Sequence, residues 1–335
     1  MLDKAMDTAV GALDRRFLLT AFLPTAVFLA LVAFTVWPSS GHAGVFAQWQ
    51  RQSGGQRLAE GIAFLAVAML SAALLGSMTG LLLKVYEGYW PGRIGEFGRR
   101  HHRAVLVDLS RRAVTDPRAY SRIEAGYPLP SDLDAVMPTT LGNVLRNAEL
   151  YPRYRYGLDA VLVWPRLYLV ASDRALAGVA SARSDMDLHV TVCTLSVLYG
   201  TVAGTDALLT GRSWWAFILF FTVPMVVAWL SYQAAVAAAR VYGGLVKAVF
   251  DVHRGDVLEK LAAEVTGPEP DRWYRLQQLW YRAVPIEASV APEPPGEGAP
   301  DEQKEAPGWW ARVPLSGWFA LAVVGVAVLA ALLSR

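Results

Sequence analysis

Five apolar stretches, each long enough to cross a bilayer, constrain the fold of this chain more than any other feature. They are residues 17–37, 61–83, 188–209, 214–239 and 315–333, and none has a charged residue at its centre. A hydrocarbon core of about 30 Å requires about 20 helical residues, and backbone groups in lipid must be satisfied within the segment. The sequence therefore predicts an all-α membrane protein with five transmembrane helices.

The lysine and arginine residues that flank the spans predict their orientation, because these residues concentrate on the cytoplasmic side. Few basic residues lie between the first and second spans or between the third and fourth, and more lie before the first, after the second and after the fourth. We therefore expect a cytoplasmic N-terminus and an external C-terminus. The first span is too long for a typical signal-peptide core, so we expect it to be retained.

The apolar stretches divide the rest of the chain into regions of different composition. We expect an N-terminal transmembrane hairpin (1–83), a cytoplasmic helical region (84–187), a central transmembrane hairpin (188–239), a cytoplasmic helical hairpin (240–285), a disordered acidic Pro-rich linker (286–308) and a C-terminal transmembrane helix (309–335). Val257, Leu258 and Leu261 recur at helical spacing, so the hairpin has an apolar face, for which we expect the 84–187 region to be the partner. Residues 160–170 are apolar but too short to span, so they form either part of that region's core or an interfacial segment.

Composition limits the classes of function that the chain can have. The net charge of +2 creates no field that favours nucleic acid, and the single cysteine, Cys193, excludes an internal disulfide. Arginine outnumbers lysine and alanine and glycine are abundant, as in high-GC genomes, so we expect a bacterial inner (plasma) membrane. The chain contains no Walker loop, G-x-S-x-G elbow, kinase motif set or dinucleotide fingerprint. We expect no cofactor and no metal.

Several residues within the spans are candidates for packing or conduction. Gly76 and Gly80 form a G-x-x-x-G pattern that brings helices close together, within one chain or between two copies. Pro224, Gly200 and Gly204 are candidates for pore lining or gating, because broken helices can line binding sites. Asp206 either binds a ligand at the outer mouth or pairs with Arg212 across the turn.

Two basic clusters are candidates for contact with lipid headgroups. Arg99, Arg100 and Arg103 follow the second span, and Arg153 and Arg155 alternate with tyrosines. Beside a membrane, anionic lipid is a nearer source of phosphate than nucleic acid, although the second cluster can also form internal salt bridges. Just before the second cluster, Thr139 or Thr140 is expected to cap a helix that ends at Pro152.

These features favour an integral membrane interaction or regulatory protein of the scaffold type, whose cytoplasmic surface binds a protein partner or a second copy. A homo-oligomeric channel or pore is the alternative, because uncharged walls that contain Ser, Thr and Gly are compatible with conduction. A third hypothesis is an enzyme at the membrane interface that uses His101 and His102, or His253 with Asp256.

Overall fold

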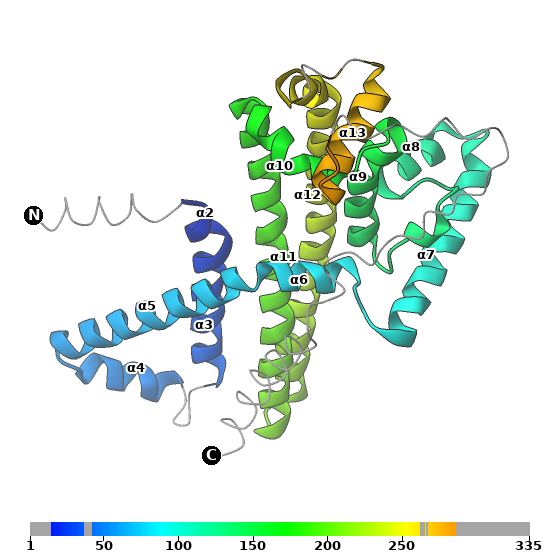
Figure 1. Ribbon diagram of the computed structural model, residues 1–335. Coiled ribbons are helices and arrows are strands. Elements are labelled where there is room, and N and C mark those ends of the chain that lie inside the picture. Colours follow the sequence, from blue (N-terminus) through cyan, green and yellow to red (C-terminus); the bar gives the residue numbers. More distant parts are fainter. Residues whose placement is uncertain (1–14, 37–41, 262–264, 266, 286–335) are drawn as a thin grey trace, which may run out of the picture. The chain divides into compact units, whose positions relative to one another are not determined.

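The computed structural model describes residues 15–36, 42–261, 265 and 267–285, and all regular structure among them is helical. This confirms the predicted all-α fold. The first part of the chain contains α2 (Arg15–Phe17), the π-helical η1 (Leu18–Phe22), α3 (Leu23–Val36), α4 (His42–Arg51), α5 (Gly54–Ser77), α6 (Thr79–Glu87) and α7 (Gly92–Ala113). It continues with α8 (Pro117–Gly126), η2 (Leu133–Ala135), α9 (Thr140–Tyr156), α10 (Ala160–Val170), α11 (Asp173–Leu209), α12 (Trp214–Leu261) and α13 (Glu269–Arg282) (Figure 1).

Among the described residues, four helical segments are long and apolar enough to cross a membrane. They are Leu18–Thr35, Gly54–Ser77, Asp173–Leu209 and Trp214–Leu261, and each overlaps one of the first four predicted spans. Many large apolar side chains of α3, α5 and α12 are exposed, as expected of surfaces that face lipid tails. The fifth predicted span, 315–333, and the linker 286–308 lie outside the described residues.

The second span differs from the prediction, which placed one helix over residues 61–83. Helix α5 begins earlier, at Gly54, because Ser53 and Gln56 form a capping box. It ends at Ser77, and α6 begins at Thr79 after a single turn residue, Met78. The Ser77 hydroxyl donates to the Leu74 carbonyl (2.7 Å) and the Thr79 hydroxyl to that of Gly76 (2.9 Å). Side-chain hydrogen bonds to the carbonyls of the preceding turn bend a helix. Glycine lowers the stability of the helix further.

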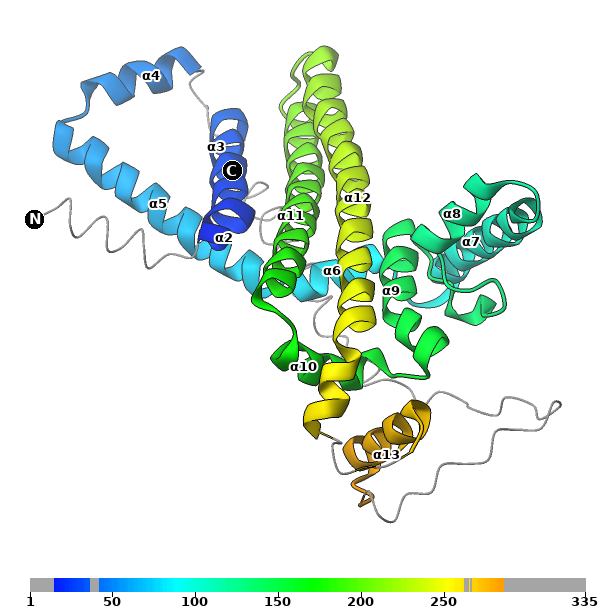
Figure 2. The ribbon, with the colours of Figure 1, turned by 90° about the horizontal axis from the view of Figure 1, so that it is seen from above.

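Helices α11 and α12 form an antiparallel hairpin along most of their length (Figures 1 and 2). Both are longer than the predicted spans, so the predicted region boundaries at 187/188 and 239/240 fall inside continuous helices. At 1.5 Å per residue, α11 extends about 22 Å before residue 188, and α12 about 33 Å beyond residue 239. The first helix of the hairpin predicted at 240–285 is therefore the end of α12 and not a separate helix. The second helix of that hairpin is α13.

A hydrophobic cluster around the ends of α11 and α12 holds the smaller helices. Val163 and Leu167 of α10 pack with Phe250 and Val257 of α12 and with Trp273 of α13, and all five are at most 1% exposed. Val257 and Leu258 of the predicted apolar face thus pack against the 84–187 region, as expected from the sequence, whereas Leu261 is 48% exposed.

A second cluster joins the helix pair to α6 and α9. Its buried residues are Leu82 and Leu83 of α6, Leu141 and Val144 of α9, Met186 and Val190 of α11, and Ala235, Val236 and Ala239 of α12. A third, smaller cluster packs α7 on α8 through residues such as Leu106 and Ile123. The second cluster surrounds the polar contacts that are described next.

Candidate functional site

Thr139 joins the end of α6 to the start of α9 at a buried contact, which we call the junction. Its hydroxyl lies 2.7 Å from the carbonyl oxygen of Tyr86 and 2.9 Å from that of Glu87, so its proton is shared between two acceptors. The same oxygen accepts the N–H of Gly142 at 3.0 Å, which caps α9. One side chain thus satisfies unpaired backbone groups at the ends of two helices. Of the two caps predicted from the sequence, the structure uses Thr139.

The two helix ends approach so closely that only glycine fits at two positions. A Cβ atom at Gly142 would lie 2.0 Å from the carbonyl oxygen of Glu87. Gly88, which ends α6, has φ of +92°, a conformation that favours glycine. Buried Asn143 fixes the loop before α9, because its amide donates to the carbonyls of Met137 (2.9 Å) and Thr139 (2.8 Å). The junction is therefore a rigid connection between α6 and α9.

Charged side chains from four helices gather around the junction. Arg183 of α11 donates to Asp187 at 3.0 Å, and Arg16 of α2 approaches the same carboxylate at 3.6 Å. Burial raises the pKa of Glu87 to about 7; the Arg183 guanidinium opposes this rise and the Glu149 carboxylate adds to it. The effect of desolvation on the pKa of Glu87 is larger than that of its attraction to the Arg183 guanidinium. This carboxyl therefore changes charge near neutral pH.

We expect stability to fall as pH rises, because folded Glu87 binds its proton more tightly than the unfolded chain does. The stabilisation is complete below the ordinary pKa of about 4.5 and is lost as pH rises through about 7. Glu87→Gln should remove this dependence and stabilise the protein at pH 8 by about 1–2 kcal/mol. Thermal unfolding, followed by reaction of buried Cys193 with a thiol-reactive dye, measures the effect. Exposed Glu259→Gln is the control, and an unchanged pH slope in Glu87→Gln would contradict the assignment.

The structure brings Gly200, Gly204 and Pro224 together in the contact between α11 and α12. A Cβ atom at Gly200 would lie 3.1 Å from Cβ of Pro224 and 2.8 Å from the methyl of Met225. One at Gly204 would lie 3.3 Å from the Phe221 side chain. Within one chain these residues are packing positions, where missing side chains let two helices approach.

Asp206 lies near the same end of α11 and pairs with Arg212 at 3.3 Å. The Arg212 guanidinium also donates to the carbonyl of Thr35 at 2.8 Å, so it joins the end of α3 to the turn between α11 and α12. Of the two readings from the sequence, the structure shows the pair with Arg212.

The first basic cluster is mostly engaged within the chain. Arg99 and Arg100 donate to Glu96, and Arg103 donates to the carbonyl of Leu133 (2.9 Å) and to Asp134 (3.3 Å). Only Arg100 of the three is largely exposed, with 77% of its side chain accessible.

The second basic cluster alternates two kinds of side chain with different roles. Tyr151 and Tyr156 both donate to Asp251 of α12, at 2.7–3.0 Å, and Tyr154 donates to Asp132 at 2.8 Å. Burial, together with the Asp251 carboxylate, raises the pKa of Tyr151. The tyrosines therefore dock α9 on its neighbours, while Arg153 and Arg155 lie on the exposed side.

The G-x-x-x-G pair does not lie on one helix, because the break at Met78 separates Gly76 in α5 from Gly80 in α6. A Cβ atom at Gly76 would lie 4.0 Å from the Phe17 ring, and one at Gly80 would contact nothing within 4 Å. Neither glycine is required for a close approach among the described residues. Contact of this pair with another copy stays a prediction.

Two of the three histidines of the enzyme hypothesis have hydrogen-bond partners within the chain. His102 Nδ1 lies 2.9 Å from the Tyr127 hydroxyl, and His253 Nδ1 lies 2.8 Å from the Asp256 carboxylate. In the part of the chain that the structure describes, no three His, Cys, Asp or Glu side chains gather as a metal site.

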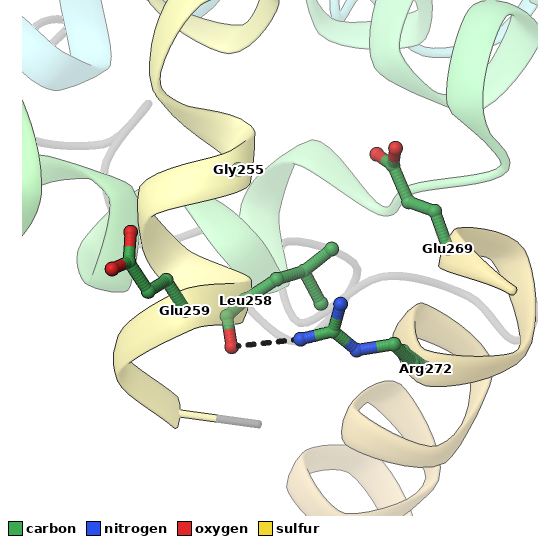
Figure 3. Close-up of a pocket in the computed structure, with 5 residues that line it drawn as sticks. All are labelled: Gly255, Leu258, Glu259, Glu269 and Arg272. Carbon is green, nitrogen blue, oxygen red and sulfur yellow. Dashed lines mark hydrogen bonds between the residues drawn. The ribbon is translucent and has the colours of Figure 1, made fainter. Parts of the chain in front are cut away.

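An open depression between α12 and α13 is lined by Gly255, Leu258, Glu259, Glu269 and Arg272 (Figure 3). The Arg272 guanidinium donates across it to the Leu258 carbonyl at 3.2 Å. Glu269 accepts from Arg254 at 3.0 Å and from the Trp273 indole at 3.3 Å. These polar groups hold α13 on α12, and they offer no arrangement for nucleophilic chemistry.

The part of the chain that the structure describes is all-helical, with four candidate transmembrane helices and smaller helices docked on a long helix pair. No protein family, curated protein or solved structure matches this sequence. The junction was not predicted as a site, because Glu87, Thr139 and Gly142 form no motif in the sequence. The cap signal at Thr139 was its one visible sign.

Proposed function

We propose that this protein is an integral membrane interaction protein of the scaffold or regulatory type, which binds a partner protein through one exposed stripe of α10. Residues Val161, Pro165, Tyr168 and Leu169 form this α10 stripe. Val161 is 49%, Tyr168 51% and Leu169 82% exposed. The positions follow the i, i+4, i+7, i+8 spacing of one helix face, and all are uncharged. This uncharged exposed face is the observation that carries the proposal.

Helix α10 is apolar on both its buried and its exposed face. Val163 and Leu167 are fully buried in the cluster with α12 and α13. The one charged side chain of α10, Arg166, turns back to the Leu162 carbonyl (2.6 Å) and lies over the Trp280 ring at 4.1 Å. The inner face accounts for docking within the chain, so the outer face remains for a partner.

The distance of α10 from the spans favours a protein partner over the bilayer. Helix α10 ends at Val170, and α11 then runs about 22 Å before its apolar span begins at residue 188. Its buried face contacts Phe250 and Val257, which lie at least 11 residues beyond the apolar span of α12. The sequence left two alternatives for residues 160–170, a core segment or an interfacial segment at the bilayer. One face of α10 lies in the core, and we assign its exposed face to a partner in the cytoplasm.

We expect Leu169→Glu to abolish partner binding without disturbing the fold, because Leu169 makes little contact within the chain. A photo-crosslinking residue at Tyr168 of the full-length protein in its native membrane should yield a discrete protein adduct. Leu169→Glu should lower the yield about tenfold or more, as for a central interface residue. Denaturing electrophoresis and mass spectrometry identify the adduct, including one with a second copy of the chain.

The matched control places the same crosslinker at Tyr120 of α8, which is similarly exposed at 59%. An adduct at Tyr168 that is insensitive to Leu169→Glu, or equally strong at Tyr120, would contradict the proposal. A fragment of residues 84–187 is unsuitable as bait, because α12 and α13 supply much of its core.

A further inference from the structure

A second exposed surface lies on the first half of α7 and combines apolar with basic side chains. Ile94 is 71% and Phe97 78% exposed, and Arg93 and Arg100 are exposed beside them. We call these four residues the α7 face. Residues 92–104 contain four arginines and one glutamate, a formal charge of +3 with histidine neutral. The pattern is that of a basic amphipathic helix.

The orientation of α7 is fixed by close backbone contacts on its other side. A Cβ atom at Gly98 would lie 2.7 Å from both the carbonyl oxygen and the Cβ of Pro138, so this side of α7 faces the loop before α9. Further along, Leu106 is fully buried. Because α7 cannot turn about its axis without breaking these contacts, Ile94 and Phe97 stay exposed among the residues that the structure describes.

Contacts between helices place the α7 face near the level at which the spans end. The Tyr86 hydroxyl lies 3.1 Å from that of Thr194, which is inside the apolar span of α11. Thr139 donates to the Tyr86 carbonyl, and the neighbouring Pro138 contacts Gly98 of α7. This chain of short contacts keeps the start of α7 beside the membrane boundary, unlike α10.

We propose that the α7 face binds the anionic headgroup layer of the membrane in which the protein lies. Ile94 and Phe97 insert among the lipids, and Arg93 and Arg100 pair with their phosphates. Charge complementarity favours this partner, since basic residues beside inserted apolar side chains bind anionic bilayers. The site is independent of the α10 stripe. It shares Arg100 with the predicted headgroup cluster but leaves out Arg99 and Arg103, which are bonded within the chain and less exposed; Arg100 also donates to Glu96 at 3.2 Å, yet 77% of its side chain is accessible.

The test measures how close the α7 face lies to lipid. Full-length protein carrying Cys193→Ala receives a single new cysteine, His101→Cys, on the same exposed side of α7. A fluorophore there is quenched by spin-labelled lipid in nanodiscs of phosphatidylcholine, with or without phosphatidylglycerol. The control is Val114→Cys, just after α7 and 84% exposed. It lies 13 residues on, about 20 Å along the helix.

We expect strong quenching at position 101 that increases with phosphatidylglycerol, and little at position 114. Adding Arg93→Ser and Arg100→Ser should remove the dependence on phosphatidylglycerol, and adding Phe97→Ser should lower quenching toward the level at position 114. Equal quenching at both positions would overturn the proposal. So would a label at position 101 that is shielded from both spin-labelled lipid and aqueous iodide, since a protein would then cover this face.

Discussion

Gly142→Ala is expected to destabilise the protein by about 3 kcal/mol or more, although it adds a single methyl group. The new Cβ would lie 2.0 Å from the carbonyl oxygen of Glu87 and 3.0 Å from Cβ of Met137. The first neighbour is backbone and cannot rotate away, so α9 must shift from α6. That shift breaks the bonds of the Thr139 hydroxyl to Tyr86 and Glu87, which leaves buried carbonyls unpaired.

The matched control for this prediction is Gly255→Ala, in the interior of α12. A Cβ atom there contacts nothing within 4 Å, so the substitution should stabilise the helix by about 0.5–1 kcal/mol. Thermal unfolding followed at buried Cys193 reports both variants, because the cluster of α6, α9, α11 and α12 includes Val190, one turn before it. Equal transition temperatures for the two variants would show that α9 can shift away from α6 with little loss of stability, which would contradict the prediction.

The sequence predicted the features that lipid imposes directly. A bilayer requires apolar helices of fixed minimum length, so composition alone located the four candidate spans that lie among the described residues. Local chemistry also limited the cap of α9 to Thr139 or Thr140, and the structure uses Thr139, since capping depends on residues within one turn. The packing of Val257 and Leu258 followed from an apolar face that needed a partner.

The ends of the helices were less predictable, because outside lipid they depend on packing. Arg240 and Lys247 follow the end of the apolar stretch of α12, yet the helix continues to Leu261 because Phe250 and Val257 are buried by α10 and α13. The opposite error occurred at Met78. There the apolar sequence continues, but hydroxyl groups and glycines end α5 at Ser77.

The roles of the polar residues depended on partners far away in the chain. Tyr151 and Asp251 are 100 residues apart, and the hydrogen bond between them docks α9 on α12. The sequence alone had suggested that the alternating aromatic and basic residues bind a ligand. Glu87 and Gly142 meet across 55 residues with no shared motif. Charge patterns show that a residue needs a partner, but only the fold determines which one.

Gly200→Leu is the second substitution with a large expected effect, a loss of about 3 kcal/mol in the stability of the α11–α12 pair. A Cβ atom at this position would already lie 2.8 Å from Met225, 3.1 Å from Pro224 and 3.4 Å from the Phe221 carbonyl oxygen. The end of Met225 can move, but the proline ring and the backbone cannot. The remaining atoms of leucine therefore force the helices apart, and Cys193, two turns away, should react faster with a thiol reagent.

The same variant separates the packing role of Gly200 from the pore role that the sequence also suggested. The control is Gly61→Leu in α5, where a Cβ atom contacts nothing within 4 Å and the residue is exposed. A packing position predicts that Gly200→Leu lowers the unfolding temperature while Gly61→Leu leaves it unchanged. A pore-lining position predicts a stable variant whose ion flux in liposomes is blocked. Because both outcomes are measured on one purified protein, a stable Gly200→Leu variant would reject the close helix contact, and a stable variant that also blocks ion flux would favour a channel.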